Sequence, residues 1–341
     1  MSKTIYYLGA GASFGKRNKD EIEEGLPIVS EIPTEIEKFK DFISNAVIPD
    51  GSTNFQNLFQ IGSADIERAK QLMLSDIDGL IAGIKEHATI DTYARKLYLT
   101  HNYHTFNKLK EILCAFFVWE QLEHKPDNRY DTFLANVLES GTLALPSEIS
   151  IISWNYDSQI EMAYKAYRYA SSLPVFEKNL EDKWPVLPKY GKVFKVNGSA
   201  TFADKSIISS IKEDNNASAA VQLILFYSQS HADISEFGFQ FKTHLSFAWE
   251  DSVNKDNMMK SILDATADTE QVVVIGYSFP YFNRETDRAI FNGMANLKKI
   301  YIQDIYPSAV EQSIQAVLPS NHTVRIVPVS DCTQFYLPIE L

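Results

Sequence analysis

Four short segments of small and polar residues each follow an apolar run, and their residue types suit a nucleotide site. Glycines let backbone amides approach a pyrophosphate closely, and amide or carboxylate side chains can hold a ribose or a base. In open α/β sheets, ligands lie beyond the carboxyl ends of the strands. We therefore expect one site formed by Gly9-Ala10-Gly11-Ala12-Ser13, Trp154-Asn155-Tyr156-Asp157, Asn197-Gly198-Ser199 and Gly276-Tyr277-Ser278-Phe279-Pro280.

Each segment also has a purely structural interpretation. Residues 9–13 could form a tight turn without a ligand, and Gly276 could simply end a strand. Asn155 and Asp157 could cap the helix expected after them, and Asp157 could serve as both cap and pocket residue. Asn197 precedes a glycine, which is a common turn signal. The sequence leaves both interpretations open.

Hydrophobic patterning predicts the elements that would position these segments. Continuous apolar runs indicate strands buried on both faces, which is typical of a parallel sheet covered on two sides. Strands are expected at 4–8, 149–154, 192–197, 272–275, 299–303 and 323–328. Helical periodicity alternates with them at 158–168, 256–266, 283–296 and 308–317. The expected fold class is α/β, with a doubly wound, Rossmann-like parallel sheet.

The remaining segments predict a single domain, residues 1–341, with a large helical insertion at 28–140 between the first and second strands. Its helices are expected at 28–42, 64–87, 91–99, 107–124 and 130–139, with Asp91 capping the third. A charged loop is expected at 16–24. Residues 200–255 are expected to be a variable loop and strand region, polar and mobile at 200–220 and with a candidate strand at 221–228.

Composition excludes several classes of function. The 341 residues carry a net charge of −12, which argues against binding nucleic acid or anionic lipid through a broad basic face. The two cysteines, Cys114 and Cys332, are too few for a four-cysteine zinc module. No apolar run is long enough to span a bilayer, and the first strand starts too early for a signal peptide. We expect a cytoplasmic protein that does not enter membranes.

The order of the motifs resembles the sirtuin-like family. The similarity is greatest to the bacterial sirtuin-like domains of antiphage defence, which hydrolyse NAD. Two helical segments, Thr89 to Ala94 and Arg129 to Leu134, also resemble insertions of that group. The motifs that carry the resemblance are Gly-Ala-Gly-Ala-Ser at 9–13, Gly-Leu-Pro at 25–27, Ser-Trp-Asn-Tyr-Asp at 153–157, Val-Asn-Gly-Ser at 196–199 and Ile-Gly-Tyr-Ser-Phe-Pro at 275–280.

The resemblance implies NAD or ADP-ribose as the ligand and gives roles to individual residues. Asn155 would contact the nicotinamide ribose or position the attacking water, and Asp157 would lie near the carboxamide. Asp304, or its neighbour Gln303, could meet the adenosine ribose, as a carboxylate often does in dinucleotide sites. The remaining assignments are a pyrophosphate cradle by Gly9, Ala10, Gly11 and Ser13 and an adenosine-side lining by Gly276 and Ser278.

Asn197 departs from the family pattern, because a histidine normally stands there as the general base. Asparagine accepts no proton at neutral pH. Either another group, such as Asp157, Asp91, His231 or His244, supplies the base, or the chain binds a nucleotide without turning it over. Nicotinamide loss passes through an oxocarbenium-like state that positioning and electrostatics can largely stabilise. A missing base would then slow hydrolysis by roughly 10²–10⁴-fold.

The resemblance therefore implies an NAD hydrolase effector that releases nicotinamide and depletes cellular NAD. The alternative is a silent nucleotide sensor or structural subunit of a defence complex, paired with an ATPase or nuclease. A third possibility is a base-exchange or cyclising enzyme that uses the same pocket. The zinc-ribbon cysteines of deacetylase sirtuins are missing, so neither zinc nor a peptide-binding groove is expected. A homo-oligomer is expected.

Overall fold

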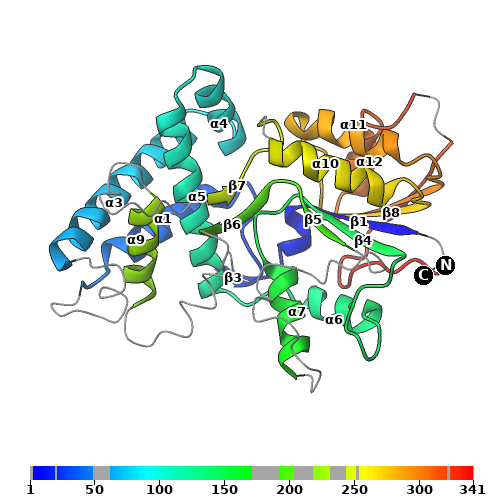
Figure 1. Ribbon diagram of the computed structural model, residues 1–341, viewed down its shortest axis with the longest axis horizontal. Coiled ribbons are helices and arrows are strands. Elements are labelled where there is room, and N and C mark those ends of the chain that lie inside the picture. Colours follow the sequence, from blue (N-terminus) through cyan, green and yellow to red (C-terminus); the bar gives the residue numbers. More distant parts are fainter. Residues whose placement is uncertain are drawn as a thin grey trace. The chain divides into compact units, whose positions relative to one another are not determined.

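The computed structural model describes residues 3–19, 21–48, 62–170, 192–202, 218–230, 243–250, 253–320 and 323–340. These residues form an α/β fold built on a six-stranded parallel sheet flanked by helices (Figure 1). Each predicted strand of this sheet is confirmed to within two residues. The strands are β1 (Thr4–Leu8), β4 (Ile149–Ser153), β5 (Val193–Lys195), β8 (Gln271–Ile275), β9 (Lys299–Gln303) and β10 (Arg325–Val329).

The strands lie in the order β10-β9-β8-β1-β4-β5. The chain moves from β1 through β4 to β5 on one side, and then crosses to β8, β9 and β10 on the other. This is the order of a Rossmann-like sheet, with its reversal between β1 and β8. Leu8, the last residue of β1, pairs with Ser153 of β4 and Ile275 of β8. The loops that follow β1, β4 and β8 therefore start side by side at the carboxyl edge.

Helices cover both faces of the sheet, as a doubly wound fold requires. Alternate residues of β1 point to opposite faces, so Tyr7 packs with one apolar cluster and Tyr6 with the other. The Tyr7 cluster includes residues of α10 (Val253–Thr266), α11 (Arg284–Gly293) and α12 (Pro307–Ile314). The Tyr6 cluster includes residues of α6 (Asn128–Val137) and α7 (Gln159–Ala170). Burial on both faces explains why the strands are continuously apolar.

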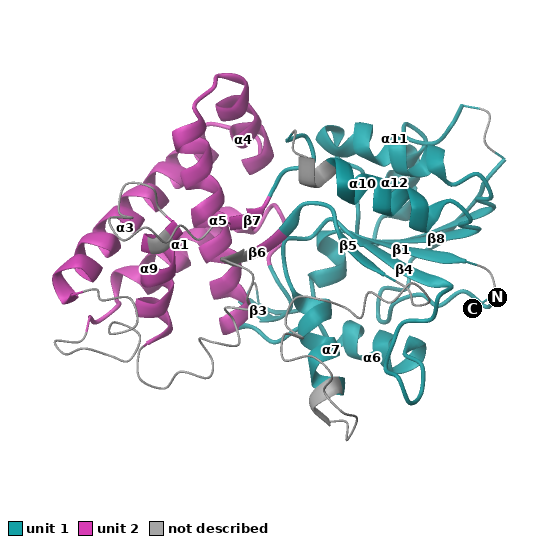
Figure 2. Ribbon diagram, in the orientation of Figure 1, with its two compact units in different colours: residues 1–26, 124–198, 246–341 teal, residues 27–123, 199–245 magenta. Residues whose placement is uncertain are grey.

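The chain divides into two compact units (Figure 2). Unit 1 comprises Met1–Leu26, His124–Gly198 and Ser246–Leu341, and it contains the six-stranded sheet. Unit 2 comprises Pro27–Glu123 and Ser199–Leu245. The predicted insertion, 28–140, covers four helices of unit 2 and also α6, which belongs to unit 1. The described helices of unit 2 are α1 (Ile32–Ser44), α3 (Ser63–Lys85), α4 (Ile90–Leu99), α5 (Tyr103–Glu123) and α9 (Ala219–Ser230).

The candidate strand at 221–228 was wrong, because these residues lie in helix α9. A short apolar run does not distinguish a buried strand from a buried helix. In unit 2, α9 packs against both α3 and α5, and its described side chains from Ala220 to Ser228 are buried. Burial around most of its circumference removed the amphipathic pattern that marks a surface helix. Of the neighbouring predicted loop, residues 203–217 lie outside the described part of the chain.

Two further local predictions need correction. The charged loop at 16–24 contains a short antiparallel hairpin of β2 (Lys16–Asn18) and β3 (Glu21–Glu24), in which Ile22 alone is buried. Helix α4 is capped by Thr89, whose Oγ1 accepts a hydrogen bond from the Thr92 amide at 3.1 Å, and Asp91 lies inside its first turn. Thr89 precedes the helix and has extended backbone geometry, as an N-cap requires.

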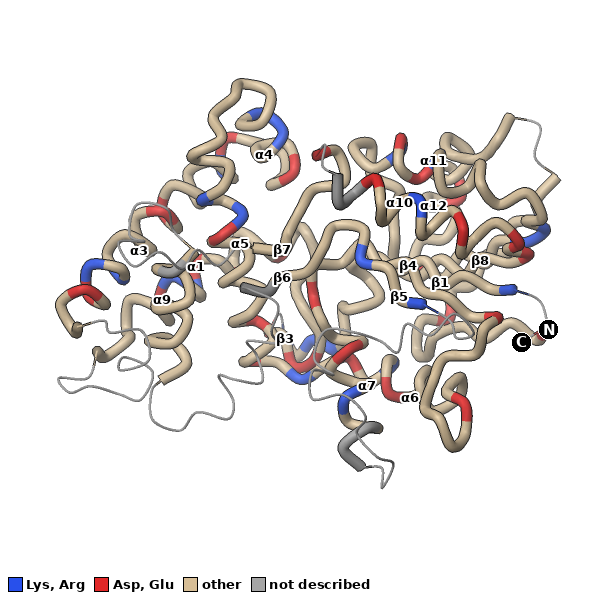
Figure 3. The backbone as a smooth tube through the Cα atoms, in the orientation of Figure 1, with Lys and Arg blue, Asp and Glu red and all other residues tan. Residues whose placement is uncertain are grey.

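Among the described helices and strands, none carries a long run of charged residues of one sign. Lys and Arg are interspersed with Asp and Glu along both units (Figure 3). Of the helices that the structure describes, none combines the length and the apolar character needed to span a bilayer.

A short sheet of β6 (Gly198–Phe202) and β7 (Thr243–Leu245) completes the described strands.

Candidate functional site

The turn after β1 packs directly against the loop after β8. The Gly9 amide donates to the Ile275 carbonyl, and the Gly11 amide donates to the Gly276 carbonyl, both at 3.0 Å. A Cβ on Gly9, Gly11 or Gly276 would lie 2.5, 2.7 or 2.3 Å, respectively, from backbone atoms of the opposite loop. Gly276 also has a φ of +57°, which disfavours other residues. The approach of the two loops therefore accounts for all three glycines without a ligand.

This packing limits how the turn could hold a phosphate. The amides of Gly9 and Gly11 donate to the neighbouring loop, and the Ala12 amide donates to the Gly9 carbonyl at 2.9 Å. Ala10 is the exposed residue of the 3₁₀ turn Ala10–Ser13, and its amide donates to none of the described residues. Among the amides of residues 9–12, that of Ala10 is the one left for a ligand.

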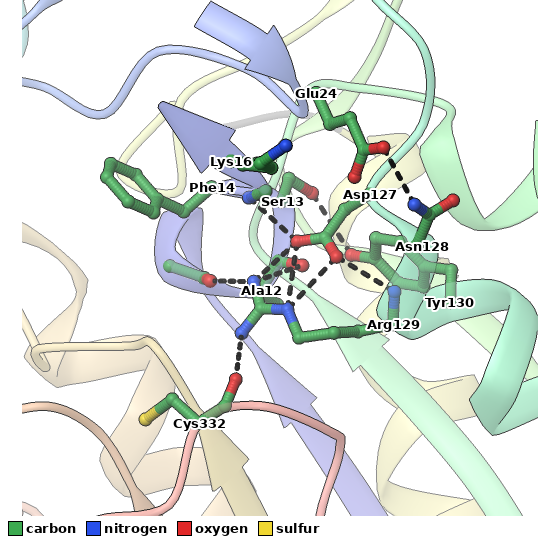
Figure 4. A network of polar contacts seen from close by, with 12 residues as sticks. Ala12, Ser13, Phe14, Lys16, Glu24, Asp127, Asn128, Arg129, Tyr130 and Cys332 are labelled. Atoms are coloured by element: carbon green, nitrogen blue, oxygen red, sulfur yellow. Dashed lines mark hydrogen bonds and ion pairs between the residues drawn. The ribbon is translucent and has the colours of Figure 1, made fainter. Parts of the chain in front are cut away.

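An arginine from α6 holds the outer side of this turn (Figure 4). Arg129 donates from Nη2 to the Gly11 carbonyl at 2.8 Å and from Nε to both carboxylate oxygens of Asp127 at 3.0 Å. Asp127 accepts the Arg129 amide at 2.9 Å, which caps α6, and the Gly15 amide at 2.8 Å. The sequence predicted a helix at 130–139 and singled out residues 129–134 through the family resemblance, but it gave Arg129 no role. Asp127, an N-cap residue type shortly before the predicted helix, is a local signal that could have pointed to this contact.

Asn155, which follows β4, joins the turn after β1. Its Nδ2 donates to the Gly9 carbonyl at 2.9 Å and to the Ser13 hydroxyl at 3.1 Å. The Gly9 carbonyl only accepts, so the amide nitrogen must be the atom that faces it. The Asn155 Oδ1 accepts no hydrogen bond from the described residues. The structure thus brings Gly9, Ser13 and Asn155 together and leaves the Asn155 Oδ1 without a donor from the part of the chain that is described.

Tyr130 of α6 extends this network and was not predicted as a site residue. Its hydroxyl lies 3.0 Å from the Ser13 Oγ, so a chain of hydrogen bonds runs from Asn155 through Ser13 to Tyr130. Burial, and then the negative charge of Asp157, raise the pKa of Tyr130 well above its usual value. The phenol therefore stays neutral, and in its hydrogen bond with Ser13 either hydroxyl can be the donor.

Asn197, which follows β5, holds the segment after β4 by its backbone. Its Nδ2 donates to the Trp154 carbonyl at 2.8 Å. Its Oδ1 is buried and has no hydrogen-bond partner among the described residues, although the residue is only 7% exposed. An unfilled buried acceptor costs about 1–3 kcal/mol. Asn155 and Asn197, at the ends of β4 and β5, thus each have a side-chain oxygen that accepts no hydrogen bond from the described residues.

Asp157 takes the capping role that the sequence left open. Its Oδ1 accepts a hydrogen bond from the Gln159 amide at 3.0 Å, at the first residue of α7. The side chain is buried, and Lys195 of β5 donates to the Asp157 carbonyl. Asp157 therefore lies in the same loop as Asn155, where it contributes a negative charge close to Tyr130.

Ser278 and Asp304 are not joined to the turn after β1 by any hydrogen bond that the described residues show. Ser278 is exposed, two residues past Gly276. Asp304 follows β9, where its Oδ1 accepts the Tyr306 amide at 2.8 Å before α12. Gln303, the alternative to Asp304, is buried and holds the backbone of Asp331, Gln334 and Tyr336. Gln303 is therefore structural.

The alternative bases in the histidine and carboxylate set stay a prediction. His231 lies outside the described residues. Asp91 and His244 belong to unit 2, and burial raises the pKa of Asp91. Across the described ranges, no group of three or more His, Cys, Asp or Glu side chains is arranged to hold a metal ion.

A second buried polar cluster lies next to the loop after β8, and the sequence analysis missed it. Asp287 of α11 accepts hydrogen bonds from the hydroxyls of Tyr7 and Tyr277, the latter at 3.1 Å from Oδ2. Asn283 donates to the Tyr277 hydroxyl at 3.1 Å. The Tyr277 ring stacks on Trp154 with centroids 5.3 Å apart. Tyr7 lies within an apolar run, where a tyrosine cannot be told from a core residue by its sequence pattern. Tyr277 lies in an expected site segment but was given no role of its own, so the sequence did not predict this cluster.

Comparison with known proteins does not assign the chain to a family. No protein-family model matches it, and a search of curated proteins finds no match. The geometry of unit 1 and the resemblance of the motifs therefore remain as grounds for a proposed function.

Proposed function

We propose that this chain is a sirtuin-like protein that binds NAD at the carboxyl edge of its six-stranded sheet and hydrolyses the nicotinamide–ribose bond. The observation that carries the proposal is the pair of hydrogen bonds from Asn155 to Gly9 and Ser13. They bring the segment after β4 onto the turn after β1, close to the reversal of strand order where such sheets bind dinucleotides.

The free groups at this edge match the donors and acceptors of NAD. The oxygens of Asn155 and Asn197 are acceptors, so they suit ribose hydroxyls or the carboxamide NH₂ of nicotinamide. The exposed Ala10 amide is a donor for a phosphate oxygen. A ligand that supplies a hydrogen to the Asn197 Oδ1 would remove the cost of leaving this buried acceptor unfilled.

Hydrolysis at such a site does not need a strong base. The bond between ribose C1′ and the nicotinamide nitrogen breaks first, and nicotinamide leaves as a neutral molecule with the electron pair. Water then adds to the oxocarbenium-like centre and afterwards loses its proton to solvent, giving ADP-ribose, nicotinamide and H⁺. The Asn155 Oδ1 would orient the water, and positioning of this kind can supply much of the rate enhancement.

The test is nicotinamide release from NAD, followed by chromatography, with the wild type, Asn155→Ala and Asn136→Ala. Asn136 lies on the exposed side of α6 and is the matched control. We expect release by the wild type and the control, and loss of about a hundredfold or more in the Asn155 variant. Absence of release by the wild type would remove the hydrolase claim. Mass spectrometry of the product separates hydrolysis from cyclisation or base exchange.

A second candidate is a catalytically silent nucleotide-binding subunit of a defence complex with an ATPase or nuclease. The observation that favours it is Asn197, which stands where the family has its base and whose amide instead holds the Trp154 carbonyl. Asn197→His discriminates the two candidates. An inert wild type together with an active histidine variant would establish the silent function, whereas an active wild type would show that no histidine is needed.

A further inference from the structure

Asp287 is a buried acid that the proposed chemistry does not use. Its side chain is fully buried in α11, and a buried carboxylate is costly unless it is hydrogen-bonded. Two tyrosine hydroxyls supply those bonds, one from β1 and one from the loop after β8. Asp287 therefore connects the two strands between which the sheet order reverses.

The segment 276–279 is held near its start by the contacts of Gly276 and Tyr277 and at its end by the packing of Phe279 on Tyr7. Tyr277 follows Gly276, whose carbonyl accepts the Gly11 amide and whose amide donates to the Gln303 carbonyl at 3.1 Å. Phe279 has a φ of +53°, an uncommon conformation for a residue with a side chain, which the surrounding packing must maintain. The Phe279 ring lies stacked on Tyr7 with centroids 5.9 Å apart.

We propose that Asp287 is a positioning residue whose ionised carboxylate locks residues 276–279 against the turn after β1 and thereby sets the affinity of the site for the ADP-ribose part of NAD. The ligand in this statement rests on the proposed function, whereas the lock on the loop does not.

The ionisation state of Asp287 decides which hydrogen bonds it can form with Tyr7 and Tyr277. A carboxylate accepts from both hydroxyls at once, but a protonated acid must donate its own hydrogen. The oxygen that carries the proton then donates to its tyrosine hydroxyl, and that hydroxyl loses the acceptor for its own hydrogen. At Tyr277 the hydroxyl would accept from both Asp287 and Asn283, and its hydrogen would no longer be bonded to Oδ2. The titratable and charged groups that act on Asp287 are Tyr7, Tyr277 and Arg284.

The lock is expected to respond near neutral pH. Burial raises the pKa of Asp287 to about 7, against the opposing effects of the two tyrosine hydroxyls and the Arg284 charge. Above this pH the carboxylate holds both tyrosines. Below it, the segment 276–279 loosens locally while Asp287 stays buried. Loss of the two hydroxyls, which lower the pKa of Asp287, would raise that pKa further, so protonation favours the loosened state over the locked one.

The experiment measures amide hydrogen exchange, corrected for intrinsic rates, in the wild type, Asp287→Asn and Tyr277→Phe. The reporters are the Gly11 and Gly276 amides, which form the two backbone bonds of this segment. We expect about tenfold faster exchange in both variants, and in the wild type when the pH falls from about 8 to about 6. ADP-ribose affinity, measured by calorimetry, should weaken about tenfold over the same pH change in the wild type and stay weak and flat in Asp287→Asn.

Tyr6→Phe is the matched control, because Tyr6 adjoins Tyr7 but bonds the Tyr336 carbonyl on the opposite face of the sheet. It should leave the reporter amides unchanged. Wild-type protection in both Asp287→Asn and Tyr277→Phe would overturn the lock. A loosened segment with unchanged ADP-ribose affinity would overturn its link to the site. If the wild type binds no ADP-ribose but the variants loosen, the proposed function fails and the lock is supported.

Discussion

Gly11 and Gly276 lie backbone to backbone, with the Gly11 amide nitrogen 3.0 Å from the Gly276 carbonyl oxygen. In Rossmann folds the glycines after the first strand permit approach of a pyrophosphate and close packing. Here the neighbouring loop already requires them. The Gly-Ala-Gly pattern is therefore no independent sign of a phosphate, and the asparagine oxygens after β4 and β5 are the groups that favour a nucleotide.

Gly276→Ala tests this contact. The added Cβ would lie 2.3 Å from the Gly11 Cα, at a position with φ of +57°. We expect the free energy of unfolding to fall by at least about 2 kcal/mol, measured by urea denaturation. Gly79→Ala is the control, since its Cβ meets nothing within 4 Å in helix α3, and it should gain about 0.5–1 kcal/mol. Equal stability of the Gly276 variant and the wild type would refute the account of this contact.

Arg129→Ala tests whether the bonds of Arg129 to Asp127 and the Gly11 carbonyl hold the turn after β1. The variant leaves Asp127, which is 3% exposed, without its cation and frees the Gly11 carbonyl. Breaking a buried pair from one side costs about 3 kcal/mol, and the melting temperature should fall accordingly. Arg129→Lys should recover little, because lysine has no planar fork. Lys16→Ala removes an exposed pair with Glu23 and should leave stability unchanged. A small effect of Arg129→Ala would mean that the turn holds its shape unaided.

The stability of the fold should depend on pH through Asp287. Burial raises its pKa from the ordinary value of 3.8 to about 7. Between these values the folded state keeps a proton that the unfolded state has lost. Stability therefore falls as the pH rises through this window, by up to about 1.4 kcal/mol per pH unit from this group, and levels off above it. Urea denaturation of the wild type and Asp287→Asn over this range should diverge. Parallel curves would contradict the raised pKa.

The sheet could be predicted from sequence because its strands are buried on both faces. Runs such as Val272 to Ile275 have few alternatives in an alternating α/β pattern. Helix α9 was not predicted, because a helix buried on most sides gives the same apolar run as a buried strand. The hairpin at 16–24 was not predicted, because its charged residues are exposed and its strands show little alternation of apolar and polar residues.

The meeting of Asn155 with the Gly9 turn was also predictable, because adjacent parallel strands end at the same edge. The side chains that fix the site were not. Arg129 reaches the Gly11 carbonyl from a helix 118 residues along the chain, and Asp287 reaches Tyr7 over 280 residues. Contacts of this kind depend on how the helices pack on the sheet, which local pattern does not encode.

The most direct test of the central claim is calorimetric titration of ADP-ribose and NAD into the wild type, Asn155→Ala and Asn136→Ala. Binding to the wild type and the Asn136 control, with affinity at least about tenfold weaker in the Asn155 variant, is the predicted result. Equal affinity in all three proteins, or no binding to the wild type, would contradict a dinucleotide site at the ends of β1 and β4.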